Sequence, residues 1–292
     1  MRRAKWLLAN AGPPDRIQAL SYAAQEVGCE VEIRSIKEMY DDEGRAPLET
    51  DSNERACVIF RGSINMSVDL RKSRPNWIGN WHSRDAYLCS HYYSYWGQYI
   101  TQQRYLILPV AEVLRNWDWL FDTLAQDNLL FIRPNSGEKE FNGELVQRKN
   151  MFGWKLVSIE TKSTLIDELC VVSTPVEIQK EVRLIIANKR VVAGSVYRLA
   201  GMIWHERLED QHDANDIIAF AEMVLAGLSP PDLPPVHCLD IAVHDSKLSI
   251  LEVGCFCCCG LYACDLHKIV PAVSDAAEQS FNQGVPTCRG SV

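Results

Sequence analysis

Two acidic residues flank a short polar turn in the last quarter of the sequence, and their spacing could hold a cation. Asp240 begins the run LDIAV and Glu252 ends the run LSILEV, with the polar residues 244–247 between them. Two apolar runs around a polar turn predict a β-hairpin, whose pairing brings both carboxylates side by side at one end. Clustered carboxylates repel each other unless a cation lies between them, and oxygen ligands suit Mg²⁺. The alternative is a pair of ordinary strand-end acids that face water.

A cluster of cysteines follows this hairpin. The cluster consists of Cys255, Cys257, Cys258, Cys259 and Cys264, and His267 comes three residues later. The order Cys-x-x-Cys and then Cys-x-x-His would permit a small zinc site. A reactive thiol is a second interpretation. The third is a tightly packed turn, because cysteine is small and tolerates burial, and this is the interpretation that we favour.

Length and composition set the outer limits. The chain has 292 residues, 47% hydrophobic and 23% charged, which is ordinary for a globular protein of one complex domain or two smaller ones. No apolar run is long enough to cross a bilayer, and the segment WLLA is too short for a signal-peptide core, so we expect a cytoplasmic protein. The 11 cysteines are odd in number and partly adjacent, which favours reduced thiols over disulfides. The net charge of −8 argues against a general nucleic-acid binder.

The first 75 residues alternate between strand and helix signals. KWLLA, CEVEI and ACVIF are predicted strands, and residues 15–27 are a predicted helix that ends at Gly28. This β–α–β order predicts a small parallel sheet. Residues 42–55 are predicted to form a polar loop.

Residues 76–104 are rich in aromatic side chains. These are Trp77, Trp81, Tyr87, Tyr92, Tyr93, Tyr95, Trp96 and Tyr99, with His82 and His91 among them. Such clusters most often pack a core or a seam between domains, and we expect that here. Contact with an acceptor substrate and stacking on nucleic-acid bases are the alternatives. The two histidines have no ligand-like spacing, and we interpret them as structural or surface residues.

The second half of the chain has an antiparallel pattern. After a predicted helix at residues 111–125 come the strands LLFIR, LCVVS, VRLIIA and RVVAGSVYR, the last two joined by the two-residue turn Asn188-Lys189. Residues 216–226 form a predicted amphipathic helix that ends at Gly227. A β/α opening followed by antiparallel sheets and helices predicts an α+β protein whose site lies between lobes.

Four motifs in this order resemble the ATP-grasp superfamily, and more narrowly a phage- and bacteria-type branch with arginines where most relatives have lysines. They are FIRPNSGEKEFNG, VVSTPVEIQKEVRLIIANKRVVAGSVYR, LDIAVHDSKLSILEV and GLYACD, within about residues 105–270. The resemblance implies the ATP-grasp fold, in which two α+β lobes sandwich a nucleotide. We therefore expect a small N-terminal α/β and aromatic-rich region at residues 1–104 and an ATP-grasp domain at residues 105–292.

The resemblance also assigns residues to the phosphates of ATP. Arg133 is where the family presents a cation, and a guanidinium can hold phosphate oxygens through two parallel hydrogen bonds. Lys139 would add a point charge, while Gly137 and Gly143 let the backbone close over the phosphates. The alternatives are a surface ion pair for Arg133 and a solvated loop residue for Lys139.

Further positions match the adenine and ribose sites of the family. Val171, Val172 and Ser173 match the segment between the two sheets that reads adenine, or else they are plain core strand. Glu181 and Arg183 share one face of a strand, because side chains two residues apart do so. Glu181 would then take ribose or orient a cation, and Arg183 would meet phosphate, unless they form a simple cross-strand pair. Arg198 is a weaker phosphate candidate.

The family's metal ligands correspond to the acidic hairpin. An acid on the first strand, a Glu on the second and an Asn two residues later hold the metal in ATP-grasp enzymes. Asp240 and Glu252 match the first two, but Gly254 stands at the third and has no side chain to offer. A backbone carbonyl, water or a substrate oxygen could replace the missing ligand.

Together these expectations describe an ATP-grasp ligase that uses ATP and Mg²⁺. ATP would phosphorylate a carboxylate to an acylphosphate, which an amine would then attack, with Arg133, Arg183 and Arg198 stabilising the transferred phosphate. The acceptor would be a small molecule, an amino acid or a peptide, and Asp265 and Lys268 lie where it could approach unless they are solvated helix residues. The alternatives are a catalytically silent nucleotide-binding protein, which Gly254 favours, and a zinc-stabilised binding module.

Overall fold

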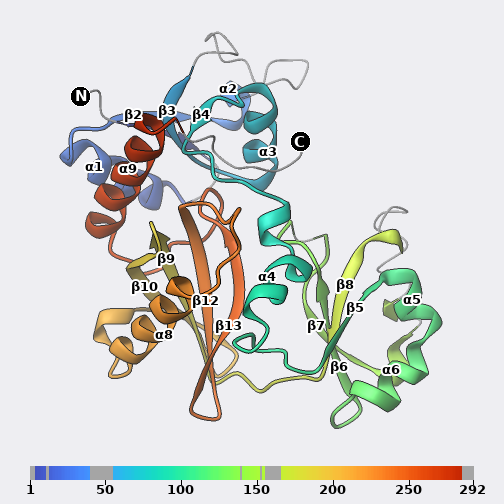
Figure 1. Cartoon of the computed structure of the whole chain (residues 1–292). Coiled ribbons are helices and arrows are strands. Elements are labelled where there is room, and N and C mark those ends of the chain that lie inside the picture. The colour runs from blue at the N-terminus through green and yellow to red at the C-terminus, as the bar shows by residue number, and fades with distance from the viewer. Residues whose placement is uncertain are drawn as a thin grey trace.

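The computed structural model describes residues 4–10, 13–39, 55–138, 140–151, 153–154 and 166–284. Three separate sheets make up this part of the chain (Figure 1). One is a parallel sheet near both termini, and the other two are antiparallel sheets that lie side by side beneath it. The architecture is therefore the mixed α+β fold that the sequence predicts. No described helix combines the length and apolar character that crossing a membrane requires.

The N-terminal sheet has the strand order β2-β1-β3-β4, with every neighbouring pair parallel. Its strands are β1 (Lys5–Ala9), β2 (Glu30–Arg34), β3 (Ala56–Arg61) and β4 (Trp77–Ile78), with helices α1 (Pro14–Glu26), α2 (Ile36–Met39) and α3 (Ile64–Ser73). This confirms the predicted parallel sheet. Of the predicted polar loop at residues 42–55, all but Arg55 lies outside the described residues.

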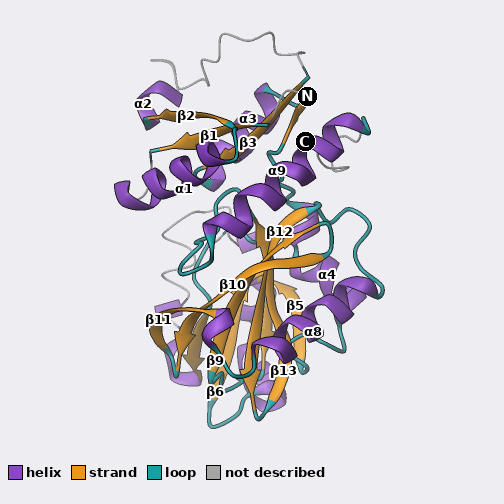
Figure 2. Cartoon of the chain, turned by 90° about the vertical axis from the view of Figure 1, so that its left-hand side faces the viewer, coloured by secondary structure: helices purple, strands orange, loops and turns teal. Residues whose placement is uncertain are grey.

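The C-terminal helix returns to this N-terminal sheet. Helix α9 (Leu266–Asn282) packs against α1 and β3, as Figures 1 and 2 show from two sides. Trp6 of β1 donates a hydrogen bond from Nε1 to Ser274 of α9 at 3.1 Å, and both side chains are buried. The division into residues 1–104 and 105–292 therefore stays a prediction, with the added feature that the last helix belongs to the core of the first region.

The first antiparallel sheet has the order β5-β8-β6-β7. Its strands are β5 (Tyr105–Pro109), β6 (Leu129–Pro134), β7 (Glu144–Gln147) and β8 (Leu169–Ser173), with helices α5 (Val110–Arg115) and α6 (Trp117–Leu124) on one face. The sequence predicted one helix here, but Asn116 divides it. The Asn116 side chain and its backbone N–H both donate to the carbonyl of Glu112 at 2.9 Å.

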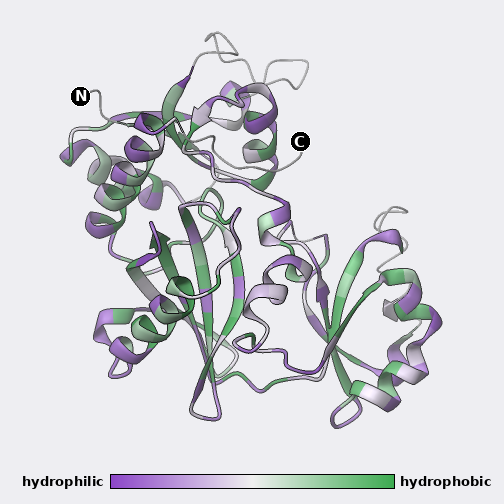
Figure 3. Ribbon diagram, viewed as in Figure 1, coloured by the Kyte–Doolittle hydropathy of each residue, from purple (hydrophilic) through white to green (hydrophobic). Residues whose placement is uncertain are grey.

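The second antiparallel sheet has the order β11-β10-β9-β12-β13. Its strands are β9 (Lys180–Ala187), β10 (Arg190–Leu199), β11 (Met202–Arg207), β12 (Val236–His244) and β13 (Lys247–Cys255), with α8 (Ala214–Ala226) packed on β10 and β12. Asn188 and Lys189 have φ angles of 50° and 65°, and Asp245 and Ser246 have 47° and 59°, so both predicted hairpins turn through two left-handed residues. Figure 3 shows apolar residues gathered along the strands of this sheet.

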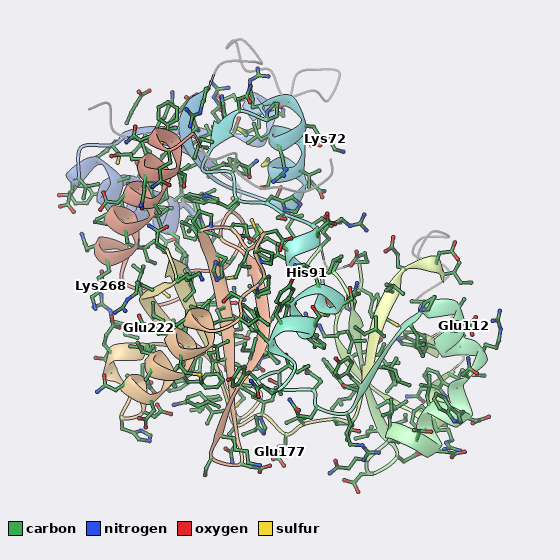
Figure 4. All side chains as sticks on the ribbon, in the orientation of Figure 1. Lys72, His91, Glu112, Glu177, Glu222 and Lys268 are labelled. Carbon is green, nitrogen blue, oxygen red and sulfur yellow. The ribbon has the colours of Figure 1, made fainter. Side chains whose placement is uncertain are left out.

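Part of the aromatic segment lies between the two antiparallel sheets. Helix α4 (Cys89–Trp96) lies there, with Tyr92, Tyr93 and Trp96 buried, which confirms the packing interpretation (Figure 1). His91 of the same helix faces outward to Asp232, with Nε2 and Oδ1 2.7 Å apart (Figure 4). Helix α4 thus fixes how the two sheets face each other.

Candidate active site

A pocket of about 280 Å³ is lined by residues from all three sheets or from the loops that follow their strands. The loop after β3 contributes Gly62 and Ser63, and the loop after β6 contributes Gly137 and Glu138. The second antiparallel sheet contributes the charged side chains of Arg183, Asp240 and Glu252. The pocket therefore brings together three of the residues that the sequence nominated, from strands far apart in the chain.

The acidic hairpin places its two carboxylates opposite each other. Asp240 of β12 pairs in register with Glu252 of β13, and the register shifts immediately afterwards between Asp240 and Ile241. The strands run on to Val236 and Cys255, so the pair lies in the middle of the hairpin and not at its end. The expected proximity is present, but the expected position was wrong because the flanking segments VHC and VGC also form strand.

Arg183 binds Asp240 through both carboxylate oxygens. Its Nε donates to Oδ1 at 2.8 Å and its Nη2 to Oδ2 at 2.7 Å, and the two residues are neighbours in the β9–β12 register. The hydroxyl of Tyr197 donates to the same Oδ2 at 3.2 Å. Asp240 is only 2% exposed. Two parallel bonds from one guanidinium and a third from a hydroxyl therefore fix the position of this buried carboxylate.

Arg183 also lies against two aromatic rings. Its guanidinium carbon is 5.3 Å from the ring centre of Tyr197 and 5.2 Å from that of Tyr262, and the two rings stack on each other. Such contacts favour a cation and restrict its side-chain rotamers. Arg183 is therefore a positioned positive charge at the wall of the pocket.

Arg133 lies behind the pocket, not on its surface. Its Nη2 is 3.0 Å from Oε1 of Glu252, and its Nη1 donates to the carbonyl of Leu251 at 3.2 Å. It is 9% exposed, and it is not among the residues that line the pocket. The sequence nominated Arg133 for direct phosphate contact, whereas the structure shows it holding Glu252 from the opposite sheet.

Glu181 lies near both acids and is paired with Arg198. The Nε of Arg198 is 3.8 Å from Oε1 of Glu181, and the Arg198 side chain is 48% exposed. Burial raises the pKa of Glu181, and the negative charges of Asp240 and Glu252 raise it further, against the opposing effect of a Tyr197 hydrogen bond. Neither Glu181 nor Arg198 lines the pocket.

Val171, Val172 and Ser173 lie within the central strand β8 and are fully buried. Val171 packs in the large core that reaches the second antiparallel sheet, while Val172 packs with α5 and α6 on the opposite face. The Ser173 hydroxyl is buried without a hydrogen-bond partner in the described structure. The connection between the two sheets begins one residue later, at Thr174.

The glycine-bearing loop after β6 closes one side of the pocket. Glu138 there faces His82, whose Nε2 is 3.6 Å from Oε1, and Arg84, whose Nε is 3.8 Å from Oε2. Burial lowers the pKa of His82 to about 4, so its imidazole is neutral at pH 7. Lys139, the other nominated phosphate ligand, lies outside the described residues.

Several pocket residues were not found from the sequence. His82 and Arg84 were interpreted as part of a structural aromatic segment, and Gly62 and Ser63 carried no motif. Only the position of Gly62 and Ser63 immediately after a predicted parallel strand could have indicated them, since ligands bind at the carboxyl ends of such strands.

Asp265 and Lys268 do not reach the pocket. Asp265 accepts from the backbone N–H of His267 and so caps α9, and Lys268 pairs with Glu209 on the outer surface (Figure 4).

The carboxylate oxygens of the hairpin are too few to hold a metal ion alone. They fit one metal ion that is also bound by the phosphates of a nucleotide. Oε2 of Glu252 receives no hydrogen bond within the described structure, so it is available as a ligand, whereas both oxygens of Asp240 already bind Arg183. At the third family position, a Cβ on Gly254 would lie 3.2 Å from Sγ of Cys238. The described residues contain no group of three His, Cys, Asp or Glu side chains that could hold a metal. Mg²⁺ commonly needs only one or two carboxylates when phosphates and water complete its shell.

Three residues of the cysteine cluster, Cys255, Cys258 and Cys259, line the pocket together with Cys238. Cys255, Cys257, Cys259 and Cys264 are buried, which agrees with the packing interpretation. The pKa of Cys257 and that of Cys259 are lowered, whereas those of Cys255 and Cys264 are raised. For Cys259, a hydrogen bond from Cys238 and the nearby cations lower the pKa to about 6.

One family model matches this sequence. Residues 116–271, more than half of the chain, match the family described as "ATP-grasp domain, R2K clade family 2". The sequence matches no curated protein.

Solved structures that share the fold have low sequence identity. D-cycloserine synthetase DcsG superposes with a TM-score of 0.63 at 13% identity, covering 94% of this chain and 100% of the other. A RimK domain ATP-grasp protein from Sphaerobacter thermophilus gives 0.58 at 13%, covering 96% and 98%. The ATP complex of D-alanine–D-alanine ligase from Bacillus anthracis gives 0.58 at 14%, covering 97% and 100%. These similarities show a shared fold.

Proposed function

We propose that this chain, which belongs to the ATP-grasp superfamily and within it to the R2K clade, is an ATP-dependent ligase that joins a carboxylate to an amine. The chemistry would pass through an acylphosphate, formed when the γ-phosphate of ATP is transferred to the carboxylate. The ligase structures that share the fold support the assignment. The nucleotide would lie between the two antiparallel sheets, with its terminal phosphate in the pocket described above.

One observation carries this proposal: Arg183, Asp240 and Glu252 meet in a pocket that two glycine-bearing loops, after β3 and after β6, also line. Phosphoryl transfer requires little covalent chemistry from a protein and depends on positioning and charge. Arg183 is held by Asp240 and two tyrosine rings, so it is oriented before any ligand arrives. Preorganised charge of this kind stabilises a transition state without reorganisation at the moment of reaction.

Each charged side chain has a proposed role. Arg183 would contact the transferred phosphate, and Glu252, with Asp240 behind it, would hold Mg²⁺ that is bound to the phosphates. The metal would supply neutralisation of phosphate charge. Arg133 would orient Glu252 from behind, and Arg198 and Lys139 would contribute further positive charge. Val171 and Ser173 would border the adenine, and Glu181 would lie near the ribose. The buried hydroxyl of Ser173 has no hydrogen-bond partner among the described residues.

A catalytically silent nucleotide-binding protein is the second candidate. The observation that favours it is the contact between Gly254 and Cys238, because the thiol occupies the space that a third metal ligand would need. Such a protein would bind ATP without turnover.

Product analysis distinguishes the two. The protein is incubated with ATP, Mg²⁺ and pooled amino acids and peptides, and nucleotides and phosphate are separated and quantified. A ligase of this type gives ADP and phosphate only when an acceptor pool is present. Binding without either product would establish the silent alternative, and AMP with pyrophosphate would contradict the acylphosphate route.

A further inference from the structure

Two cysteines from different segments of the chain meet at the active-site pocket. Cys238 lies on β12, Cys259 lies on the loop after β13, and both line the pocket. Both are free thiols, 4% and 8% exposed, and a hydrogen bond joins their side chains. A reagent small enough to enter the pocket therefore reaches two thiols that are already in contact.

The position of Cys238 is fixed by the sheet. Strand β12 lies between β9 and β13 and is hydrogen-bonded to both, and Cys238 pairs in register with Gly254. A Cβ on Gly254 would lie 3.2 Å from Sγ of Cys238, so the glycine leaves room for this thiol. Cys238 and Asp240 share a face of β12, because side chains two residues apart do so. The thiol is thus a neighbour of the acidic pair.

Cys259 lies among positive charges. Arg61 donates from Nη1 to its Sγ at 3.5 Å. The hydrogen bond from Cys238, together with the guanidinium groups of Arg61 and Arg183, lowers the pKa of Cys259 to about 6 against the opposing effect of burial. The thiolate is the form of cysteine that attacks an oxidant, and nearby arginines favour it. Of the two thiols, Cys259 is therefore the one that reacts first.

The loop that carries Cys259 also contacts Arg183. Nη1 of Arg183 donates to the carbonyl of Gly260 at 3.4 Å, and its guanidinium carbon lies 5.2 Å from the ring centre of Tyr262. A disulfide joins two sulfur atoms at about 2.05 Å, which is closer than two hydrogen-bonded thiols. Because β12 is held on both sides, formation of the bond must draw the loop toward β12. Gly260 and Tyr262 then move relative to Arg183.

We propose that Cys238 and Cys259 form a reversible disulfide when the protein meets an oxidant, and that this bond weakens nucleotide binding by displacing the loop that contacts Arg183. Formation of the disulfide needs only the two thiols, whereas its effect on the nucleotide rests on the proposed function. The bond would make the site respond to the oxidant level around the protein.

The reaction balances with a hydroperoxide as the oxidant. The Cys259 thiolate attacks one oxygen of hydrogen peroxide, the O–O bond breaks, and a sulfenic acid and hydroxide form. Sγ of Cys238 then attacks the sulfur of the sulfenic acid, the S–O bond breaks, and the oxygen leaves as water with the proton of the Cys238 thiol. The hydroxide takes up the proton that Cys259 released. Two thiols and one peroxide thus give one disulfide and two water molecules, and a dithiol reductant reverses the change.

Tryptic mapping of the full chain tests whether the disulfide forms. Trypsin cuts after lysine and arginine, so Cys238 is the one cysteine of the peptide 208–247, and the whole cysteine cluster falls in the next peptide, 248–268. The unmodified protein is treated with hydrogen peroxide at pH 7, the remaining thiols are blocked, and the digest is analysed by mass spectrometry with and without reduction. We expect these two peptides to be linked until reduction, with fragmentation placing the bond at Cys259.

Three single variants locate the bond independently. Cys238→Ser and Cys259→Ser should each abolish the linked pair of peptides. Cys264→Ser is the matched control, because Cys264 is a buried member of the same cluster that does not line the pocket, and this variant should keep the linked pair. No linked pair in the unmodified protein, or a disulfide inside the peptide 248–268 instead, would overturn the proposal. This result does not depend on whether a variant folds.

Melting temperatures test the effect on the nucleotide. Reduced and peroxide-treated protein are each heated with and without ATP and Mg²⁺. We expect the rise caused by ATP to be at least halved in the linked protein and to return with dithiothreitol, whereas Cys259→Ser should show the same rise before and after peroxide. An equal rise in linked and reduced protein would overturn the effect on binding. If linked peptides form but even the reduced protein shows no rise, the proposed function fails and the disulfide stands.

Discussion

Arg133 of β6 and Glu252 of β13 are joined across the two antiparallel sheets, with 3.0 Å between Nη2 and Oε1. Each strand belongs to a different lobe, so this pair fixes the position of Glu252 relative to the first sheet. The Arg133 side chain is 11% exposed and that of Glu252 is 29% exposed. The ion pair is therefore partly buried. Its removal should lower the free energy of unfolding and should also change the orientation of Glu252 in the pocket.

Replacing Arg133 with methionine keeps the apolar stem and removes the charge. We expect Arg133→Met to lower the free energy of unfolding by roughly 1–3 kcal/mol, because Glu252 is left partly buried without its partner. ATP turnover should fall as well, since Glu252 loses its orientation. Urea unfolding and ADP release measure the two effects, with Arg115→Gln as the control. A tenfold loss of ATP affinity with unchanged stability would instead indicate that Arg133 contacts phosphate directly.

The second prediction concerns Gly254, the position at which the resemblance to ATP-grasp enzymes implies an Asn ligand. Gly254→Asn alone should lower the melting temperature by several degrees, because its Cβ would lie 3.2 Å from Sγ of Cys238. Gly254→Asn combined with Cys238→Ala should recover stability and lower the Mg²⁺ concentration needed for half-maximal turnover. Thermal unfolding and a Mg²⁺ titration of activity check both parts. If Gly254→Asn alone were as stable as the unmodified protein, the proposed steric conflict between the new side chain and Cys238 would be contradicted.

The third prediction concerns the pocket thiols. Because the pKa of Cys259 is lowered to about 6, iodoacetamide at pH 7 should alkylate Cys259 faster than Cys264, whose pKa burial raises to about 12. Mg²⁺-ATP should slow the reaction by covering the pocket that Cys259 lines. Peptide mass spectrometry after timed labelling gives the two rates. Equal labelling of both cysteines, with no effect of nucleotide, would remove Cys259 from the site.

The fourth prediction is a pH dependence of stability. Burial lowers the pKa of His237 to about 4 from an ordinary 6.5, so the unfolded chain binds a proton there before the folded chain does. The stability that depends on neutral His237 is complete above pH 6.5 and falls as the pH decreases toward 4. At pH 5 the loss is on the order of 2 kcal/mol. His237→Phe should remove about this much of the difference in unfolding free energy between pH 7 and pH 5, whereas the exposed His267→Phe should not.

The sequence predicted most of the elements that position the site, because these have strong local signals. KWLLA and LCVVS coincide with β1 and β8, and the turns at Asn188 and Asp245 use residues that tolerate positive φ. Strand β11 was not predicted, because Met202, Ile203 and Trp204 form an exposed edge without alternation of buried and exposed side chains. Edge strands depend on their partner more than on their own pattern.

The sequence predicted several residues of the site but not which residues contact one another there. The order of the motifs predicted that Arg183, Asp240 and Glu252 belong to one site, and the structure places all three at one pocket. That Arg133 would reach Glu252 from another sheet, and that His82 and Gly62 would join them, depends on how the three sheets pack. Contacts between distant segments leave no periodicity in the sequence.

The most direct test of the nucleotide assignment is the melting temperature of the unmodified protein with increasing ATP and Mg²⁺, compared with Glu252→Gln. A ligand that binds only the folded state stabilises it by about 2.7 kcal/mol at a hundredfold excess over Kd. We predict a rise that saturates at millimolar ATP, that is larger with Mg²⁺ than without it, and that loses its Mg²⁺ dependence in Glu252→Gln. No shift at millimolar ATP with Mg²⁺ would contradict nucleotide binding. An unchanged Mg²⁺ dependence in Glu252→Gln would contradict the metal role of that residue.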